Sequence, residues 1–310
     1  MAKIAFMFPG QGAQYVGMGK DFYDRIDISR KMFDTASDAV GLDLNKICFE
    51  ENEDINITEF TQIALLATSM AMLMALKERG VESSVNAGLS LGEYGALVSS
   101  GIMDYEAACK VVRKRGIYMQ EEVPAGEGAM SAVLGLSADI IEEVLKKEGK
   151  PVEIANYNCP GQIVISGETK AVGEVSEKIK EAGAKRVLPL KVSGPFHSSL
   201  LKGAGEKLGE VLKDVKLNDI TIPYISNVTA EYVRDKNLVK ELLMRQVSSS
   251  VRWQQSVELM LRDGVDTFIE IGPGKTLSNF MKKIEKGENV RIMNVEKVED
   301  LDTVAEAVSR

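Results

Sequence analysis

Short apolar runs alternate with segments of helical periodicity along almost the whole 310-residue chain. The first run, Ile4–Phe8, ends at a Pro-Gly pair, and a second run occupies residues 84–87. Strands separated by helices favour a parallel sheet, because neighbouring parallel strands need a long crossover connection. The alternation therefore predicts an α/β fold. In the first part of the chain, it also predicts helices at 28–40, 60–79, 90–99 and 104–120.

Residues 126–193 show a different order of predicted elements. The order is strand, helix, two strands, helix and strand, at 129–135, 137–148, 152–157, 162–166, 169–182 and 185–190. This order is typical of ferredoxin-like folds. We therefore expect a small ferredoxin-like subdomain (126–193) inserted into a large α/β-hydrolase-like domain with a parallel sheet (1–125 and 194–310). Predicted elements after the insert are helices at 198–213, 236–245, 254–263 and 275–285, strands at 222–226, 266–271 and 290–295, and a terminal helix.

Composition and charge narrow the class of protein. The net charge of −8 disfavours nucleic acid as a partner, because phosphate binding relies on clustered Lys and Arg. Cys48, Cys109 and Cys159 are far apart and lack metal-ligand spacing, which is typical of reduced thiols in a cytoplasmic protein. The most apolar segment, 63–76, is too short to span a bilayer and is expected to be a buried helix. We expect no metal site and no membrane partner.

A serine flanked by glycines is the clearest chemical motif. Residues 88–92 read Gly-Leu-Ser-Leu-Gly, and they lie between a predicted strand and a predicted helix, as a nucleophile elbow requires. Serine needs a neighbouring base at neutral pH, and histidine titrates nearest that pH. His197 is the only histidine in the chain, so any Ser–His mechanism must pair Ser90 with His197. A chance motif match and a surface histidine are the structural alternatives.

Six motifs resemble, in order, those of the malonyl-CoA:acyl carrier protein transacylases of fatty acid synthesis. They are Phe-Pro-Gly-Gln-Gly (8–12), Gly-Leu-Ser-Leu-Gly-Glu-Tyr (88–94), Arg-Gly with Met-Gln (115–116, 119–120), Asn-Cys-Pro-Gly-Gln (158–162), Gly-Pro-Phe-His (194–197) and Gly-Pro-Gly-Lys (272–275). The resemblance covers essentially the full length. It implies ping-pong transfer of a malonyl group from malonyl-CoA to the phosphopantetheine thiol of acyl carrier protein. It implies no cofactor beyond the coenzyme A and phosphopantetheine thioesters, which are substrates.

The resemblance also implies roles for single residues. Ser90 would attack the malonyl thioester while His197 takes and returns its proton. The backbone amides of Gln11 and Leu91 would form the oxyanion hole, so the backbone at Gln11 should matter more than its side chain. The main-chain carbonyl of Gln246 would orient His197 in place of a triad carboxylate. We therefore expect the Gln246 side chain to be dispensable.

Arg115 is the expected specificity residue. A guanidinium can grip the free carboxylate of a malonyl group with two hydrogen bonds, and an acetyl group would leave that cation unpaired. The alternative is a solvated arginine on a helix face, like Arg113. Phe196 is expected to contact the acyl group, and Asn158 and Asn227 are expected to lie in loops that line the cleft.

Leu89 is a departure from the family pattern, because most relatives have histidine immediately before the nucleophile. The change removes a polar neighbour and leaves the base in place. Two alternatives stay open. A serine thioesterase or esterase of the α/β-hydrolase type shares the elbow and the order of serine and histidine, and an inactive scaffold that only binds carrier protein is the reading that Leu89 invites.

Carrier proteins are strongly acidic, and this chain is acidic too. We therefore expect a local basic patch near the site entrance, because like charges repel the partner at long range. The candidate residues are Lys185, Arg186, Lys275, Lys282 and Lys283.

Overall fold

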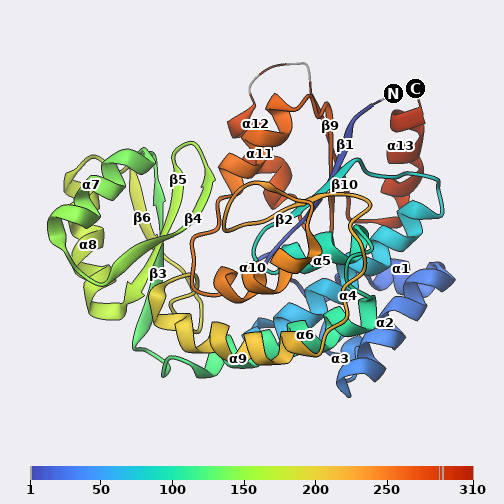
Figure 1. Cartoon of the computed structure of the whole chain (residues 1–310), viewed down its shortest axis with the longest axis horizontal. Helices are drawn as coiled ribbons and strands as arrows, with labels where there is room; N and C mark the ends of the chain where they lie inside the picture. The colour runs from blue at the N-terminus through green and yellow to red at the C-terminus, as the bar shows by residue number, and fades with distance from the viewer. Residues whose placement is uncertain (1, 286, 288–289, 310) are drawn as a thin grey trace.

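The computed structural model describes residues 2–285, 287 and 290–309, and its strands form two separate sheets (Figure 1). The larger sheet has the order β10-β9-β1-β2-β7-β8. Its strands are β1 (Ile4–Phe8), β2 (Val85–Gly88), β7 (Tyr224–Ile225), β8 (Tyr232–Val233), β9 (Thr267–Ile271) and β10 (Arg291–Val295).

The larger sheet is parallel except at one edge. β1 pairs in parallel with β2 and β9, β9 with β10, and β2 with β7, whereas β8 returns antiparallel to β7. The mixed α/β architecture with a parallel-rich sheet confirms the prediction. The edge strand β8 was not predicted, because a two-residue strand carries too little pattern to recognise.

Alternate residues of β1 serve two different cores, as the period of a strand requires. Phe6 and Phe8 pack in one core with helices α4 and α5, and Ala5 and Met7 pack in the other with α11 and α12. The helices around this sheet are α1 (Lys20–Arg25), α2 (Asp27–Val40), α3 (Leu44–Phe49), α4 (Thr58–Lys77), α5 (Gly92–Ser99), α6 (Tyr105–Glu121), α9 (Lys202–Lys213), α10 (Val239–Gln246), α11 (Trp253–Arg262), α12 (Thr276–Ile284) and α13 (Val298–Ser309). Short 3₁₀ turns lie at η1 (Asp54–Asn56), η2 (Ser199–Leu201) and η3 (Lys236–Leu238).

Helix α4 is the central apolar helix of the protein. Within the described residues, it alone is long and apolar enough to cross a membrane, and 83% of its apolar window is buried inside the protein. It is therefore a core helix, as predicted for 63–76. The three cysteines are also buried, as unpaired thiols.

The smaller sheet is antiparallel and has the order β4-β5-β3-β6. Its elements follow the predicted sequence: β3 (Gly128–Leu134), α7 (Ala138–Glu148), β4 (Val152–Cys159), β5 (Gln162–Glu168), α8 (Thr169–Glu181) and β6 (Arg186–Pro189). Helices α7 and α8 cover one face with a core of their own. Met130 and Val164 point to the opposite face and join the main core, so this sheet supplies a wall toward the rest of the molecule.

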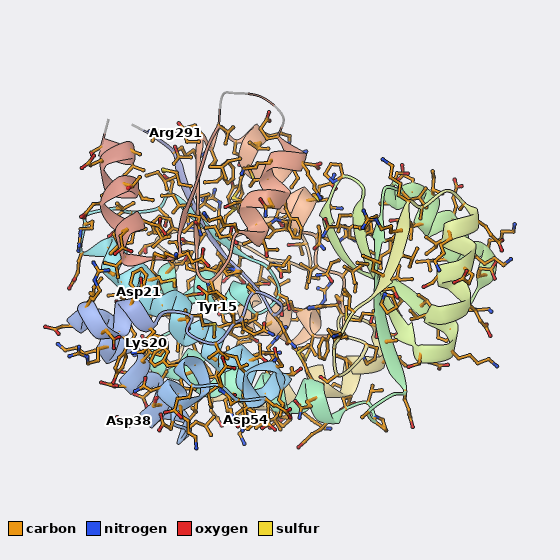
Figure 2. All side chains as sticks on the ribbon, turned by 180° about the vertical axis from the view of Figure 1, so that it is seen from behind. Tyr15, Lys20, Asp21, Asp38, Asp54 and Arg291 are labelled. Atoms are coloured by element: carbon orange, nitrogen blue, oxygen red, sulfur yellow. The ribbon has the colours of Figure 1, made fainter. Side chains whose placement is uncertain are left out.

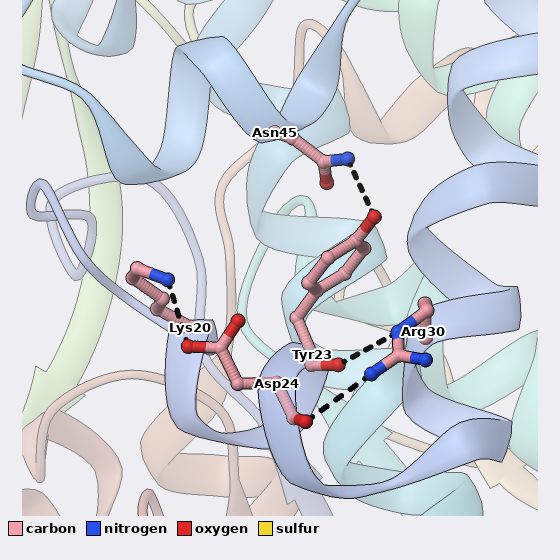
Figure 3. Close-up of polar contacts among 5 residues, drawn as sticks. All are labelled: Lys20, Tyr23, Asp24, Arg30 and Asn45. Atoms are coloured by element: carbon pink, nitrogen blue, oxygen red, sulfur yellow. Dashed lines mark hydrogen bonds and ion pairs between the residues drawn. The ribbon is translucent and has the colours of Figure 1, made fainter.

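Polar contacts join the three N-terminal helices, two of which (α1 and α3) were not predicted. Lys20 pairs with Asp24 within α1, Arg30 of α2 donates to the carbonyl oxygens of Tyr23 and Asp24, and Asn45 of α3 donates to the Tyr23 hydroxyl (Figure 3). Figure 2 shows these helices from behind, at the end of the molecule away from the smaller sheet. No residue of α1, α2 or α3 lines the cavity described below.

Candidate active site

Ser90 lies in a sharp turn at the carboxyl end of β2, before α5 begins at Gly92. The predicted helix 90–99 therefore starts two residues late, because Ser90 has a φ of 54°, outside the helical region. A side chain at Gly92 would collide with the carbonyl of Phe8, and one at Gly10 with the carbonyl of Leu89. The glycines thus let the loop after β1 pack directly against the elbow.

His197 is within hydrogen-bonding distance of Ser90. Its Nε2 lies 2.7 Å from Ser90 Oγ, and its Nδ1 lies 2.9 Å from the main-chain oxygen of Gln246. A carbonyl only accepts, so Nδ1 carries the proton and the Nε2 lone pair faces the serine hydroxyl. His197 also has a positive φ of 58°. Ser90 and His197 therefore both hold strained backbone conformations, as residues at functional sites often do.

Burial keeps this histidine neutral. His197 is 4% exposed, and desolvation together with the nearby Arg115 guanidinium lowers its pKa from 6.5 to about 4. A neutral imidazole at physiological pH can accept a proton from serine.

Arg115 is fully buried in α6 and its guanidinium reaches Ser90. Its Nη2 lies 3.1 Å from Ser90 Oγ and 2.9 Å from Gln246 Oε1, and its Nη1 lies 2.7 Å from Gln62 Oε1. The alternative of a solvated arginine is wrong for Arg115. Burial lowers its pKa from the ordinary value.

Arg113 behaves differently from Arg115, although it lies only two residues away on the same helix. Its guanidinium pairs with the Glu59 carboxylate at 2.6 Å and stacks on the Phe60 ring. It does not line the cavity, and it is itself only partly exposed rather than fully solvated.

Gln246, the last residue of α10, uses both its main chain and its side chain in the site. Its Nε2 donates to the main-chain oxygen of Ser90 at 2.9 Å and to Glu93 Oε2 at 2.6 Å, and its Oε1 accepts from Arg115. The side chain is completely buried. The expectation of a dispensable side chain did not include these contacts, and loss of the side chain would leave polar groups of Ser90, Glu93 and Arg115 without this partner.

Glu93 and Asn227 complete a buried polar cluster behind the elbow. The Asn227 side chain accepts a hydrogen bond from the main-chain amide of Ser90 at 2.6 Å and donates one to the Gly88 carbonyl at 2.7 Å. The main-chain amide of Asn227 donates to Glu93 Oε2 at 3.1 Å. Asn227 was expected in the cleft wall, but it does not line the cavity and is 1% exposed.

Glu93 was not among the predicted site residues. A carboxylate in an otherwise apolar helix immediately after the nucleophile was the sequence signal that could have found it. Burial raises its pKa from 4.5 to about 7, against the opposing effects of Gln246, Asn227 and Arg115.

A cavity of about 720 Å³ opens above the serine, between the larger sheet's loops and the smaller sheet. Its size suits a small-molecule or cofactor-sized group. Ser90, His197 and Arg115 all lie in its wall, so the structure brings the three groups together. The rest of the wall includes Gln11, Gln62, Leu89, Met119, Met130, Asn158, Val164, Phe196, Thr276 and Phe280.

The other predicted site residues surround the same cavity or the elbow. Phe196 and Asn158 are each 6% exposed and line the wall, but Asn158 lies on β4 and not in a loop. Its Oδ1 has no hydrogen-bond partner in the described part of the chain. Gln11 follows β1, and Leu91 is the residue before α5. Neither of their backbone amides donates to an acceptor among the described residues.

A serine hydrogen-bonded to a histidine, set at the end of a parallel strand in the wall of a cavity, is the arrangement typical of enzymes that transfer acyl groups. Residues 5–300 match the family model described as acyl transferase domain, and the chain belongs to this family. It is an acyltransferase.

Relatives of known name agree with this membership. The malonyl CoA-acyl carrier protein transacylase of Bacillus subtilis is 49% identical over 290 residues, which cover 92% of each chain. The crystal structure of the transacylase of the same name from Clostridium perfringens has a TM-score of 0.95 at 46% identity, covering 99% of this chain and 98% of that one. A malonyl-transacylase in complex with its type II PKS acyl-carrier protein has a TM-score of 0.95 at 38% identity, covering 99% and 100%.

Proposed function

We propose that this enzyme transfers a malonyl group from malonyl-CoA to the phosphopantetheine thiol of acyl carrier protein, through a malonyl-serine intermediate. One observation carries the proposal. The hydroxyl of Ser90 lies 2.7 Å from the histidine base and 3.1 Å from the buried Arg115 guanidinium, whose hydrogen bonds within the described residues go to Gln62, Ser90 and Gln246 and to no carboxylate.

Ser90 is the nucleophile of the first half-reaction. Its Oγ attacks the thioester carbonyl as the proton passes to His197 Nε2. The carbon–sulfur bond then breaks, and the same proton goes to the sulfur of the departing coenzyme A. The backbone amides of Gln11 and Leu91 are proposed to hold the tetrahedral oxyanion, because they lie beside the elbow and donate to no acceptor in the part of the chain that the structure describes.

Arg115 is proposed to select the malonyl group. The malonyl carboxylate is one carbon away from the thioester carbonyl, so a carbonyl placed at Ser90 Oγ brings the carboxylate to a guanidinium that touches the same oxygen. An acetyl group would leave this buried cation with no anionic partner, and that cost disfavours acetyl transfer. Phe196 and Asn158 are proposed contacts of the acyl chain in the cavity wall.

The second half-reaction reverses the first with a new thiol. His197 takes the proton of the phosphopantetheine thiol, and the sulfur attacks the carbonyl of the malonyl-serine ester. The ester bond to Ser90 Oγ then breaks, and His197 returns the proton to that oxygen. We propose that acyl carrier protein docks by exposed basic residues at the cavity entrance. Lys283 donates to Gln162, a residue of the cavity wall, and Lys275 precedes the wall residue Thr276. Lys185, Arg186 and Lys282 are also exposed.

The finer features of the enzyme are proposed on the same basis. Residues 1–125 and 194–310 are proposed as an α/β-hydrolase-like catalytic domain, and 126–193 as a ferredoxin-like subdomain, with the cavity between them. The proposed chemistry needs no cofactor or metal, since coenzyme A and phosphopantetheine thioesters are substrates. We propose a cytoplasmic enzyme without nucleic-acid or membrane partners.

The test separates transfer from its two alternatives. The enzyme is incubated with malonyl-CoA, and holo acyl carrier protein is then added, with the apo form that lacks the thiol as the control. We expect malonyl carrier protein only with the holo form. Release of free malonate without any thiol would identify a hydrolase, and no reaction with malonyl-CoA would identify a scaffold; either result would overturn the proposal.

A further inference from the structure

Glu93 is a buried carboxyl group for which the proposed reaction has no step. It lies three residues after Ser90 in α5 and is 0% exposed. Placing an ionisable carboxyl in the interior costs free energy unless its hydrogen bonds compensate for lost hydration. Within the described residues, only one of its two oxygens has hydrogen-bond partners, and these are the Gln246 side chain and the main-chain amide of Asn227.

The Gln246 side-chain amide lies between the Arg115 guanidinium, which only donates hydrogen bonds, and two oxygens that accept them. The Arg115 guanidinium has no acceptor atom, so it faces Oε1 at 2.9 Å. The Ser90 carbonyl and Glu93 Oε2 face Nε2 at 2.9 and 2.6 Å. A flipped amide would place its NH₂ group against the guanidinium and its oxygen against Glu93. Glu93, the Ser90 carbonyl and the Arg115 guanidinium therefore fix together which way this amide points, and the contact to Glu93 is the shortest of the three.

The same carboxyl oxygen also accepts a hydrogen bond from the main-chain amide of Asn227, whose side chain bonds the main chain of the elbow. The Asn227 side chain bonds the amide of Ser90 and the carbonyl of Gly88, on either side of the strained turn. Glu93 thus contacts both residues that hold the nucleophile's main chain, although it touches neither reacting atom.

We propose that Glu93 is a positioning residue for acyl transfer, which fixes the Gln246 amide and, through it, the guanidinium of Arg115. This role rests on the proposed function, in which Arg115 holds the malonyl carboxylate. Without an acceptor at position 93, Gln246 Nε2 keeps only the Ser90 carbonyl as an acceptor among the described residues, so the amide is held less firmly beside the guanidinium, whose other side-chain amide acceptor is Gln62. His197 is held by the main-chain oxygen of Gln246, so its chemistry should suffer less. The loss should therefore fall on malonyl selection.

The experiment compares Glu93→Met, which keeps the volume and removes the acceptor, with Glu93→Gln, which keeps one acceptor oxygen. kcat/KM is measured for malonyl-CoA and for acetyl-CoA with holo acyl carrier protein, alongside the thermal midpoint. We expect Glu93→Met to lower the malonyl-to-acetyl ratio about tenfold and Glu93→Gln to keep it within about threefold. Ser29→Ala is the control, because Ser29 makes a buried hydrogen bond to the Ala71 carbonyl far from the cavity.

A merely structural role would lower the thermal midpoint without moving the ratio. The inference is overturned if Glu93→Met keeps the wild-type ratio, if Glu93→Gln loses as much as Glu93→Met, or if Ser29→Ala changes the ratio equally. Should Glu93→Met fail to fold, Glu93→Asp takes its place, because its shorter side chain draws the carboxylate away from Nε2. An unchanged ratio in that variant also overturns the role. A wild-type enzyme without malonyl transfer would instead refute the proposed function.

Discussion

The Arg115 guanidinium donates a hydrogen bond to the Ser90 hydroxyl, with 3.1 Å between Nη2 and Oγ. One oxygen atom is therefore shared by the base and by a buried cation. In the proposed mechanism, an anion bound by this cation lies very near the carbonyl that Ser90 attacks. The proposal therefore links the catalytic step to the choice of acyl group through this contact, and variants of Arg115 and Ser90 separate the two.

Replacing Arg115 with leucine should mainly remove malonyl preference. Charge-assisted hydrogen bonds to the carboxylate would be lost, so kcat/KM for malonyl-CoA should fall about tenfold to a hundredfold, with a much smaller change for acetyl-CoA. The measurement is transfer of each acyl group to holo acyl carrier protein. Arg113→Leu is the matched control on the same helix, since it lies outside the cavity wall. Equal loss for both acyl groups would argue against a carboxylate-binding role.

The pH dependence of the acylation rate should reflect the lowered pKa of His197. Only neutral His197 can accept the serine proton, and its pKa is lowered to about 4 by burial and by Arg115. The base-dependent acylation rate should therefore hold as the pH falls below 6.5, and should decline only as it approaches about 4. Pre-steady-state acylation of Ser90 by malonyl-CoA, followed across this range, checks the expectation. A midpoint near the ordinary value of 6.5 would contradict it.

Glu93 should make the folded state more stable in acid than at neutral pH. Its folded pKa, about 7, is raised above the ordinary 4.5 by burial, so its contribution is fully present below about 4.5 and is lost as the pH rises through 7. Denaturant unfolding of wild type and Glu93→Gln at pH 5 and pH 8 measures the difference. The wild type should lose stability relative to Glu93→Gln between these values. A difference that does not change with pH would disprove the shift.

The loop after β1 should matter through its main chain. A methyl group at position 10 would collide with the Leu89 carbonyl, so Gly10→Ala should displace the Gln11 amide from the elbow. Loss of one oxyanion donor lowers kcat by about 10²–10³-fold. Gln11→Ala should cost much less, because its side chain only bonds the Thr58 hydroxyl at 3.1 Å. Comparison of kcat for Gly10→Ala and Gln11→Ala tests the role of the backbone. An equal loss of kcat in both variants would contradict it.

The sequence pattern was sufficient for most of the larger elements. Buried strands such as Ile4–Phe8 and long helices such as α4 have enough periodicity to recognise, and their observed bounds lie within a few residues of the predicted ones. The short elements α1, α3 and β8 were not predicted, because a few residues do not establish a hydrophobic period. The strand predicted at 222–226 is shorter in the structure and spans Tyr224–Ile225, which are the residues of this segment that pair with β2 and β8. Pairing with neighbouring strands cannot be seen in the local sequence.

The site was predictable where one residue type had one possible partner. A single histidine fixed the pairing of Ser90 with His197, and the structure places them in contact. The buried cluster of Glu93, Asn227 and the Gln246 side chain was not predictable from local sequence. Its members come from three separate segments, and each hydrogen bond between them depends on the way that the chain packs.

Mass measurement of the intact enzyme after brief incubation with malonyl-CoA tests the central claim most directly. Wild type should gain the mass of one malonyl group, which holo acyl carrier protein then removes. Ser90→Ala should gain none, whereas Ser100→Ala, a buried serine after the end of α5, should label like wild type. A Ser90→Ala protein that still carries the malonyl group would contradict the account.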